Sequence, residues 1–196
     1  MTIRTDHVGG ERATRAMPAW TLALPVVVVL LAATVASGLV LLNRSPRAPW
    51  VAGGTAAVGA KAVDFSSWDL KGDPVKLSDL AGRPVLLTFW ATWCTACHDE
   101  FPTLQRLEDH YGQAGLTVLA VDYREADSGA MQRFLDRLNV RFQAVIDPNG
   151  AIASAYGVDI GLPVNVWIDR SQTVTQVMLG EKQAADLEAA AASIDA

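Results

Sequence analysis

The sequence predicts an α/β domain, built on a central mixed sheet with helices on both faces and preceded by one N-terminal transmembrane helix. Three observations support this fold class. Residues 20–42 carry no charged side chain. From Lys61 onward, strand-like and helix-like patterns alternate. The apolar run Val85–Trp90 is closely followed by the only two cysteines of the chain, Cys94 and Cys97.

The uncharged segment is long enough to cross a bilayer. As an α-helix, residues 20–42 would extend about 35 Å at about 1.5 Å per residue. Trp20 stands where an interfacial aromatic is expected, and a single proline such as Pro25 is tolerated in a membrane helix. The alternative is a signal peptide cleaved after Ala36, but the apolar stretch is longer than a usual signal core. In either case the remainder of the chain is exported.

The flanking segments complete the predicted organisation. Residues 1–19 are polar and are expected to form a cytoplasmic arm. Residues 43–60 are rich in Pro, Gly and Ala, a composition typical of a flexible linker. Residues 61–196 then form the domain, on the extracytoplasmic side of a single-pass membrane protein. The net charge of -5 and the lack of a Lys/Arg-rich run argue against a nucleic-acid partner.

The first half of the domain is predicted to contain a hairpin, a buried central strand and an amphipathic helix. The hairpin turns at Lys71-Gly72-Asp73, and Ser78 is expected to cap a short helical turn after it. The segments are a first hairpin strand at Val63–Leu70, a second at Pro74–Leu77, the central strand at Val85–Trp90, and a helix with Phe101, Leu104 and Leu107 on one side.

The second half continues the alternation and closes with a helix. Ser128 is expected to cap the helix that follows the second buried strand. The segments are a strand at Leu116–Val121, a helix carrying Met131, Phe134, Leu135 and Leu138, a strand at Ala144–Ile146 closed by the turn Asp147–Gly150, a short helix through Tyr156, an antiparallel pair at Val164–Ile168 and Val174–Leu179, and an alanine-rich helix from about Lys182.

The spacing of the two cysteines indicates redox chemistry. A disulfide framework needs several pairs, and a zinc site needs two further ligands that His7, His98 and His110 do not supply as a motif. A cysteine at a helix start faces unpaired N–H groups and the positive end of the dipole, which favour the reactive thiolate. Cys94 would attack a partner disulfide, and Cys97, one turn inside, would release the partner. The alternatives are a structural disulfide and an incidental pair of cysteines.

The stretches GRPVLLTFWATWCTACHDEFPTL and GLPVNVWID resemble the TlpA/ResA/CcmG group of membrane-anchored thioredoxin-like proteins, over about Lys61 to Gly180. The resemblance implies a thioredoxin-like fold. It also implies a role for individual residues: Cys94 as the attacking cysteine, Cys97 as the buried resolving one, Trp93 as the aromatic beside the site, Pro102 as a kink in the active-site helix, and Leu162-Pro163 as a substrate-facing loop with a cis peptide bond.

Glu100 is a candidate for proton transfer, because the ResA-like branch uses a glutamate at this position in the proton chemistry of its cysteines. Burial would raise the pKa of this carboxyl. The alternative is a solvated acid attracted to the helix start. Two positions depart from the related proteins: Thr88 stands where thioredoxins carry a buried acid, and Leu162 where this group usually has threonine. His98 is expected to be an ordinary surface histidine.

The predicted function is a membrane-anchored extracytoplasmic thiol:disulfide oxidoreductase that reduces cysteine pairs in exported proteins, for example apocytochromes awaiting haem. The resemblance, and not the residue chemistry, implies this direction of electron flow. It also implies re-reduction by a membrane electron donor of the CcdA/DsbD type. No cofactor beyond the redox-active disulfide and no metal are expected.

Two other functions remain as alternatives. A peroxiredoxin-type thiol peroxidase shares the architecture, but its Pro-x-x-x-Thr-x-x-Cys signature would need proline and threonine where Leu87 and Ala91 stand. A Sco-like copper-binding protein holds its metal with two cysteines and a distant histidine, but it spaces the cysteines as CxxxC.

Overall fold

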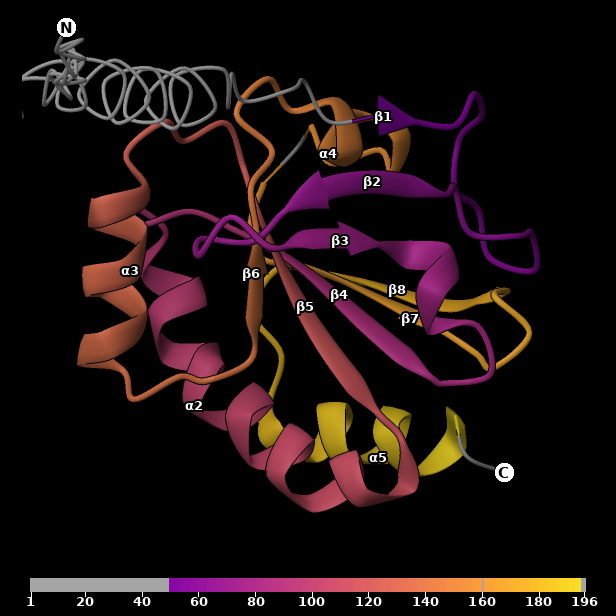
Figure 1. Cartoon of the computed structure of the whole chain (residues 1–196). Helices are drawn as coiled ribbons and strands as arrows, with labels where there is room; N and C mark the ends of the chain where they lie inside the picture. Colours follow the sequence, from indigo (N-terminus) through magenta and orange to yellow (C-terminus); the bar gives the residue numbers. More distant parts are fainter. Residues whose placement is uncertain (1–49, 160, 195–196) are drawn as a thin grey trace, which may run out of the picture. The chain divides into compact units, whose positions relative to one another are not determined.

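The computed structural model describes residues 50–159 and 161–194 (Figure 1). The predicted cytoplasmic arm, residues 1–19, and the predicted transmembrane helix, residues 20–42, lie outside the described residues. Among the residues that are described, no helix is both long enough and apolar enough to cross a membrane.

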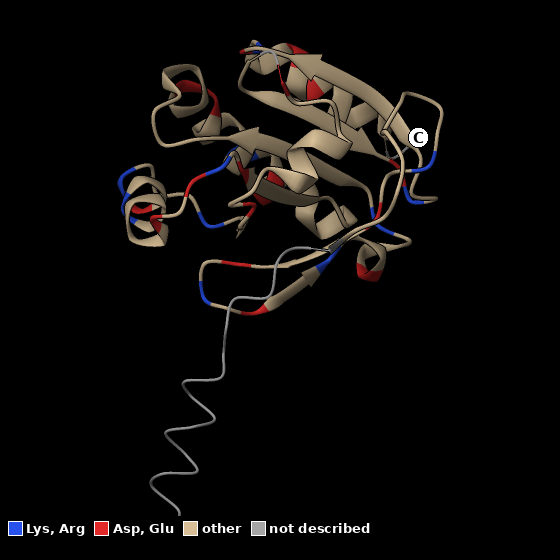
Figure 2. Cartoon of the chain, turned by 90° about the horizontal axis from the view of Figure 1, so that it is seen from above, with Lys and Arg blue, Asp and Glu red and all other residues tan. Residues whose placement is uncertain are grey.

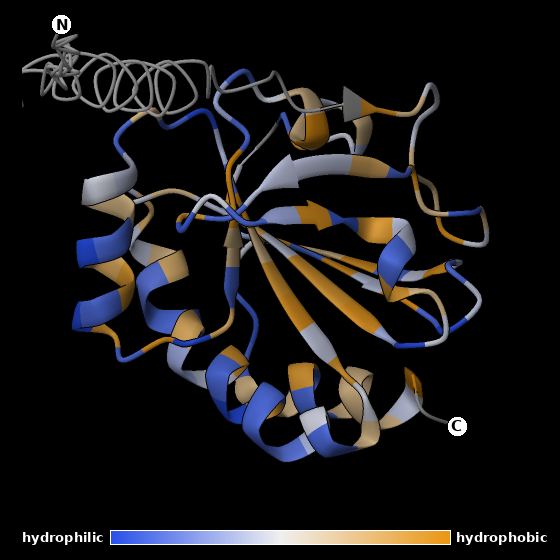
Figure 3. Ribbon diagram, viewed as in Figure 1, coloured by the Kyte–Doolittle hydropathy of each residue, from blue (hydrophilic) through white to orange (hydrophobic). Residues whose placement is uncertain are grey.

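A five-stranded mixed sheet forms the centre of the domain, in the order β6-β5-β4-β7-β8. The first three strands run parallel, and β7 and β8 are antiparallel to their neighbours. All six residues of β4 are buried, as expected for a strand covered on both faces. The hydropathy colouring of Figure 3 shows that hydrophobic residues predominate in the central strands. The strands are β4 (Val85–Trp90), β5 (Thr117–Asp122), β6 (Gln143–Val145), β7 (Val164–Ile168) and β8 (Val174–Leu179).

Helices cover both faces of this sheet, so the predicted α/β arrangement is confirmed. Buried side chains of α2, α3 and α5 pack together against one face. The other face is covered by α4 and by the N-terminal strands (Figure 1). The helices are α2 (Thr95–Tyr111), α3 (Ser128–Arg137), α4 (Ala151–Ala155) and α5 (Ala184–Ile194), with a 3-10 turn, η2 (Gly112–Ala114), after α2.

The predicted N-terminal hairpin is present as part of a small three-stranded sheet. Its strands are β1 (Trp50–Val51), β2 (Phe65–Trp68) and β3 (Pro74–Lys76), followed by the 3-10 turn η1 (Leu77–Leu80). The predicted cap at Ser78 is wrong. Ser78 lies inside η1, whose N-cap residue Lys76 makes no side-chain cap bond, and the Ser78 N–H donates to the Asp64 carboxylate at 2.9 Å.

The domain begins earlier than the predicted boundary at Lys61. β1 pairs with β2, the Ala56 N–H donates to the Ala155 carbonyl at 2.8 Å, and the Gly59 N–H donates to the Val174 carbonyl at 2.8 Å. Small residues make these contacts through backbone groups, so a composition rich in Gly and Ala gives no sign of them. Of the predicted linker 43–60, residues 50–60 therefore pack on the domain, and the rest lies outside the described residues.

Aromatic packing fixes α2 against the end of β4. The Trp90 ring lies 5.2 Å from that of Phe101 and 5.1 Å from that of Phe134, centroid to centroid. Phe101 in turn contacts Phe142 edge to face at 5.1 Å. Tilted and edge-on arrangements of this kind are the favourable ones for aromatic pairs. They hold the strand-to-helix junction, where the two cysteines lie, on a rigid base.

Candidate active site

Cys94 and Cys97 lie at the N-terminal end of α2 and are joined by a disulfide, with their Cα atoms 5.3 Å apart. Cys94 is the N-cap residue, and its Sγ accepts the Cys97 N–H at 3.1 Å. Cys94 retains 6% exposure and Cys97 none. The structure thus gives Cys94 the outer position and Cys97 the inner one. Backbone N–H groups and the helix dipole favour a negative charge on the outer sulfur.

A tight turn leads from β4 into this helix. The Cys94 N–H donates to the Ala91 carbonyl at 3.1 Å, which closes the turn over Thr92 and Trp93. The Trp93 side chain is 65% exposed beside the disulfide. Thr92 donates twice to Glu125, from its N–H at 2.7 Å and from its hydroxyl at 2.5 Å.

The second loop of the candidate site precedes β7. The Leu162–Pro163 peptide bond is cis, as the resemblance to the TlpA/ResA/CcmG group implied. Leu162 packs against the apolar cluster that contains both cysteines, and the Pro163 carbonyl accepts the Gly180 N–H at 2.8 Å. Pro102 lies inside α2, as expected. The structure therefore brings Trp93, Leu162 and Pro163 to the end of the domain that carries the disulfide.

Glu100 is buried, with only 2% of its surface exposed. The alternative of a solvated acid is therefore wrong. Its carboxylate accepts the Asn165 side-chain N–H at 2.9 Å and the Lys182 backbone N–H at 3.0 Å. Loss of hydration raises the pKa of Glu100, and these two hydrogen bonds oppose that rise without cancelling it.

Sequence reasoning missed Asn165, the partner of Glu100. Asn165 on β7 lies opposite Thr88 on β4, and both side chains are fully buried. Within the described part of the chain, Thr88 Oγ1 and Asn165 Oδ1 have no hydrogen-bond partner. A buried polar group without a partner is costly. An asparagine inside the apolar run VNVWI was the available signal, because interior strand positions of such a sheet are otherwise apolar.

A second group of buried acids, also missed, lies at the carboxyl ends of β5 and β6. The Asp122 carboxylate accepts the backbone N–H groups of Asp147 and Glu125, the latter at 2.8 Å. Asp122 is 1% exposed and Asp147 is fully buried. Desolvation raises the pKa of Asp122 to about 6 and also raises that of Asp147. The Asp147 carboxylate accepts the Ala153 N–H at 2.9 Å.

Charged residues of both signs are distributed along the loops and helices of the described chain (Figure 2). His98 lies on the exposed side of α2, with Nδ1 3.7 Å from an Asp99 carboxylate oxygen. Within residues 50–159 and 161–194, no group of three or more His, Cys, Asp or Glu could hold a metal ion.

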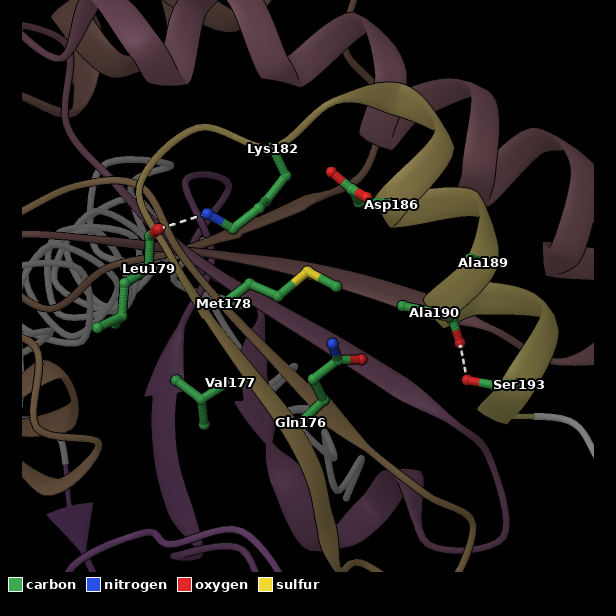
Figure 4. A pocket seen from close by; sticks show the side chains of 9 residues that line it. All are labelled: Gln176, Val177, Met178, Leu179, Lys182, Asp186, Ala189, Ala190 and Ser193. Atoms are coloured by element: carbon green, nitrogen blue, oxygen red, sulfur yellow. Dashed lines mark hydrogen bonds between the residues drawn. The ribbon is translucent and has the colours of Figure 1, made fainter.

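A shallow surface depression of about 530 Å³ lies between β8 and α5 (Figure 4). Its lining includes Gln176, Met178 and Asp186 but neither cysteine. Lys182 also lines it, with Nζ donating to the Leu179 carbonyl at 2.6 Å while its backbone N–H holds Glu100. The depression thus borders the loop that carries Lys182 and contacts Glu100, and it does not include the disulfide.

The sequence matches the model of the AhpC/TSA family over residues 58–177. It is 36% identical over 131 residues to the thiol-disulfide oxidoreductase ResA of Bacillus thuringiensis subsp. konkukian, covering 67% of this chain and 75% of the relative. For ResA of Geobacillus kaustophilus the identity is 37% over 132 residues, with the same coverage of both chains.

The chain is also similar to solved structures of thiol-disulfide oxidoreductases. A Chlorobium tepidum protein described as a thiol:disulfide interchange protein DsbE aligns with a TM-score of 0.67 at 33% identity, over 72% of this chain and 100% of that one. A secreted Mycobacterium tuberculosis disulfide oxidoreductase, described as homologous to E. coli DsbE, aligns with a TM-score of 0.59 at 27% identity, over 66% and 95% of the two chains. These similarities confirm the thioredoxin-like fold.

Proposed function

The chain belongs to the AhpC/TSA family of thioredoxin-like proteins and is a thiol-disulfide oxidoreductase of the ResA/DsbE type, and on this premise we propose that it is anchored in the membrane and reduces disulfides of exported proteins. The observation that carries the chemistry is the unequal placement of the two sulfurs. Cys94 Sγ caps α2 and accepts the Cys97 N–H, while Cys97 is sealed from solvent.

The reaction begins with the reduced protein. The Cys94 thiolate attacks one sulfur of the client disulfide, so that a mixed disulfide forms and the other client sulfur leaves as a thiolate. Cys97 then loses its proton and attacks the Cys94 sulfur. The client leaves as a dithiol, reduced by two electrons, and the protein is left with the Cys94–Cys97 disulfide. A membrane donor of the CcdA/DsbD type would return the two electrons.

Glu100 is the proposed acceptor of the Cys97 proton. It follows Cys97 by one turn of α2, and desolvation raises its pKa, which makes its carboxylate a stronger base than an exposed one. Trp93, Leu162 and Pro163 form the proposed client surface beside the disulfide. The expected clients are exported proteins with cysteine pairs, such as apocytochromes before haem attachment.

The membrane anchor is proposed from the sequence alone, through the uncharged segment 20–42. It would keep the domain on the extracytoplasmic side, next to its electron donor. Membrane fractionation followed by alkaline extraction tests this. The full chain should remain with the bilayer, and a chain beginning at residue 43 should be released.

Trapping tests the exchange mechanism. Cys97→Ser should accumulate a mixed disulfide with the client, because the resolving thiol is gone, whereas the matched control Cys94→Ser should trap nothing. A complex that forms through Cys97 in the Cys94→Ser variant would contradict the assigned roles.

The reduction potential of the Cys94–Cys97 pair tests the direction of electron flow. A value of about −120 mV, typical of a strong oxidant, would overturn the reductant role.

A thiol peroxidase is the second candidate, because the match is to the AhpC/TSA family. The residues before Cys94 do not fit it, since Leu87 and Ala91 are buried apolar residues where the peroxidase signature has proline and threonine. Rapid consumption of hydrogen peroxide with oxidation of Cys94 would favour this candidate over client reduction.

A further inference from the structure

We propose that Glu125 is a positioning residue for the thiol-disulfide exchange, because it clamps the turn that presents Cys94. The clamp comprises the Glu125 carboxylate together with the N–H and hydroxyl of Thr92. This inference rests on the oxidoreductase activity and holds for either direction of electron flow.

The contact between Glu125 and Thr92 has two points. One carboxylate oxygen accepts the Thr92 backbone N–H at 2.7 Å, and the other accepts its hydroxyl at 2.5 Å. Two donors from a single residue fix both its backbone and its side chain, and hydrogen bonds to an ionised acceptor are the stronger kind. Thr92 is thereby held in one orientation two residues before Cys94.

Glu125 is itself held on buried structure. Its backbone N–H donates to the Asp122 carboxylate at 2.8 Å, and that carboxylate also accepts the Asp147 N–H. Asp122 ends β5 and lies beside Trp90, the last residue of β4, whose carbonyl accepts the Tyr123 N–H at 2.7 Å. The clamp thus ties the active-site turn to the carboxyl ends of three neighbouring strands.

The position of the turn determines the surroundings of the Cys94 sulfur. The turn closes through the Cys94 N–H and the Ala91 carbonyl, and Thr92 is one of its two central residues. If Thr92 is released, the turn can shift, and Cys94 Sγ then loses its alignment with the Cys97 N–H at the helix start. That N–H is the donor that favours the thiolate. Release of the clamp should therefore make Cys94 a weaker acid and a slower nucleophile.

Charge-conserving variants separate position from electrostatics. Glu125→Asp keeps the negative charge but is one methylene too short to hold both donors, and Thr92→Val removes only the hydroxyl. Thr92→Ser keeps both donors and is the conservative rescue. Glu108→Asp is the matched control, because the Glu108 carboxylate accepts the Val118 backbone N–H at 3.4 Å near the far end of α2.

The experiment measures the rate of Cys94 alkylation as a function of pH in the reduced full chain. It also measures the reduction potential of the Cys94–Cys97 pair. Glu125→Asp and Thr92→Val should move the alkylation midpoint upward by about one pH unit, which is roughly tenfold less thiolate below the midpoint. Thr92→Ser and Glu108→Asp should match the wild type. If Glu125→Asp and Thr92→Val lower only the unfolding temperature and leave the midpoint and the potential unchanged, Glu125 has a purely structural role and the proposal is wrong.

Discussion

Glu100 shows how burial turns an ordinary side chain into a candidate proton acceptor. Only the ionised carboxylate can accept the Cys97 proton, so the rate of mixed-disulfide resolution should fall as the pH falls through the raised pKa of Glu100. Glu100→Gln should lose this pH dependence and resolve the mixed disulfide about a hundredfold more slowly. Quenched-flow measurement with a model disulfide peptide checks both effects. An unchanged pH profile would show that another group takes the proton.

The hydrogen bond from Asn165 should help to set the pKa of Glu100. Its side-chain N–H donates to the Glu100 carboxylate and lowers the pKa of that group, so Asn165→Leu should raise it further and move the pH edge of resolution upward. The variant should also lose about 1–3 kcal/mol of unfolding free energy, because a buried carboxylate loses a partner. A pH edge that stays in place, measured in the same assay, would contradict the assigned contact.

Asp122 should give the folded state a distinctive pH dependence. Its pKa is about 6 in the folded protein against a usual 3.8, so the folded state binds this proton more tightly than the unfolded chain. The contribution is fully present below about pH 4 and is lost as the pH rises through 6, on the order of 3 kcal/mol in all. Denaturant titrations from pH 4 to 7 should show this decline in the wild type and a flatter profile in Asp122→Asn. If stability falls equally with pH in the wild type and in Asp122→Asn, Asp122 does not contribute this pH dependence.

Residues within a contiguous motif could be predicted from the sequence, whereas their distant partners could not. Cys94, Cys97 and Trp93 share one strand-to-helix segment, and Pro163 stands in a second recognisable one. Asn165 contacts Glu100 across 65 positions and Glu125 contacts Thr92 across 33. No periodicity or spacing rule links such pairs, because the sheet topology brings them together.

At the scale of elements, the start of α3 corrects the predicted cap. Asp127, and not Ser128, accepts the Ala130 N–H, at 2.9 Å. Asp127→Ala should therefore lower the unfolding free energy by about 1 kcal/mol, while Ser128→Ala should leave it nearly unchanged. Thermal or chemical denaturation of the two variants distinguishes the residues. A larger loss for Ser128→Ala would reverse the assignment.

The elements themselves could be predicted because their patterns are strong. The nearly continuous apolar run of β4 and the helical spacing of Phe101, Leu104 and Leu107 in α2 leave few alternatives. The N-cap residue of α3 was harder to predict, because Asp127 and Ser128 are adjacent and both residue types favour N-cap positions. Which of them adopts the capping geometry depends on how the chain leaves β5, and the local sequence does not specify this.

At the scale of the whole molecule, alternating strand and helix patterns predicted the mixed sheet, and the structure adds how its faces are divided. α2, α3 and α5 share one face, and α4 shares the other with the strands β1–β3. The early start of the domain at residues 50–60 could not be predicted. Those residues attach through backbone hydrogen bonds that small side chains permit but do not encode.

The division of faces also positions the chemistry. The disulfide lies where β4 passes into α2. Glu100, on the buried side of α2, is bonded to Asn165 of β7, and the Asp122–Glu125–Thr92 contacts lie at the carboxyl ends of the neighbouring strands. Two separate polar networks therefore approach the same junction. We propose that the first exchanges a proton with Cys97 and that the second holds the turn before Cys94.

The most direct test of the central claim is the pH dependence of alkylation for each cysteine in the reduced protein, resolved by mass spectrometry. A sulfur at a helix start should react first, with a midpoint below the usual value of about 8.5, while a fully buried one should react slowly at every pH. The predicted result is early modification of Cys94 alone. A midpoint for Cys94 at or above 8.5, or modification of Cys97 before Cys94, would contradict the proposed exchange mechanism.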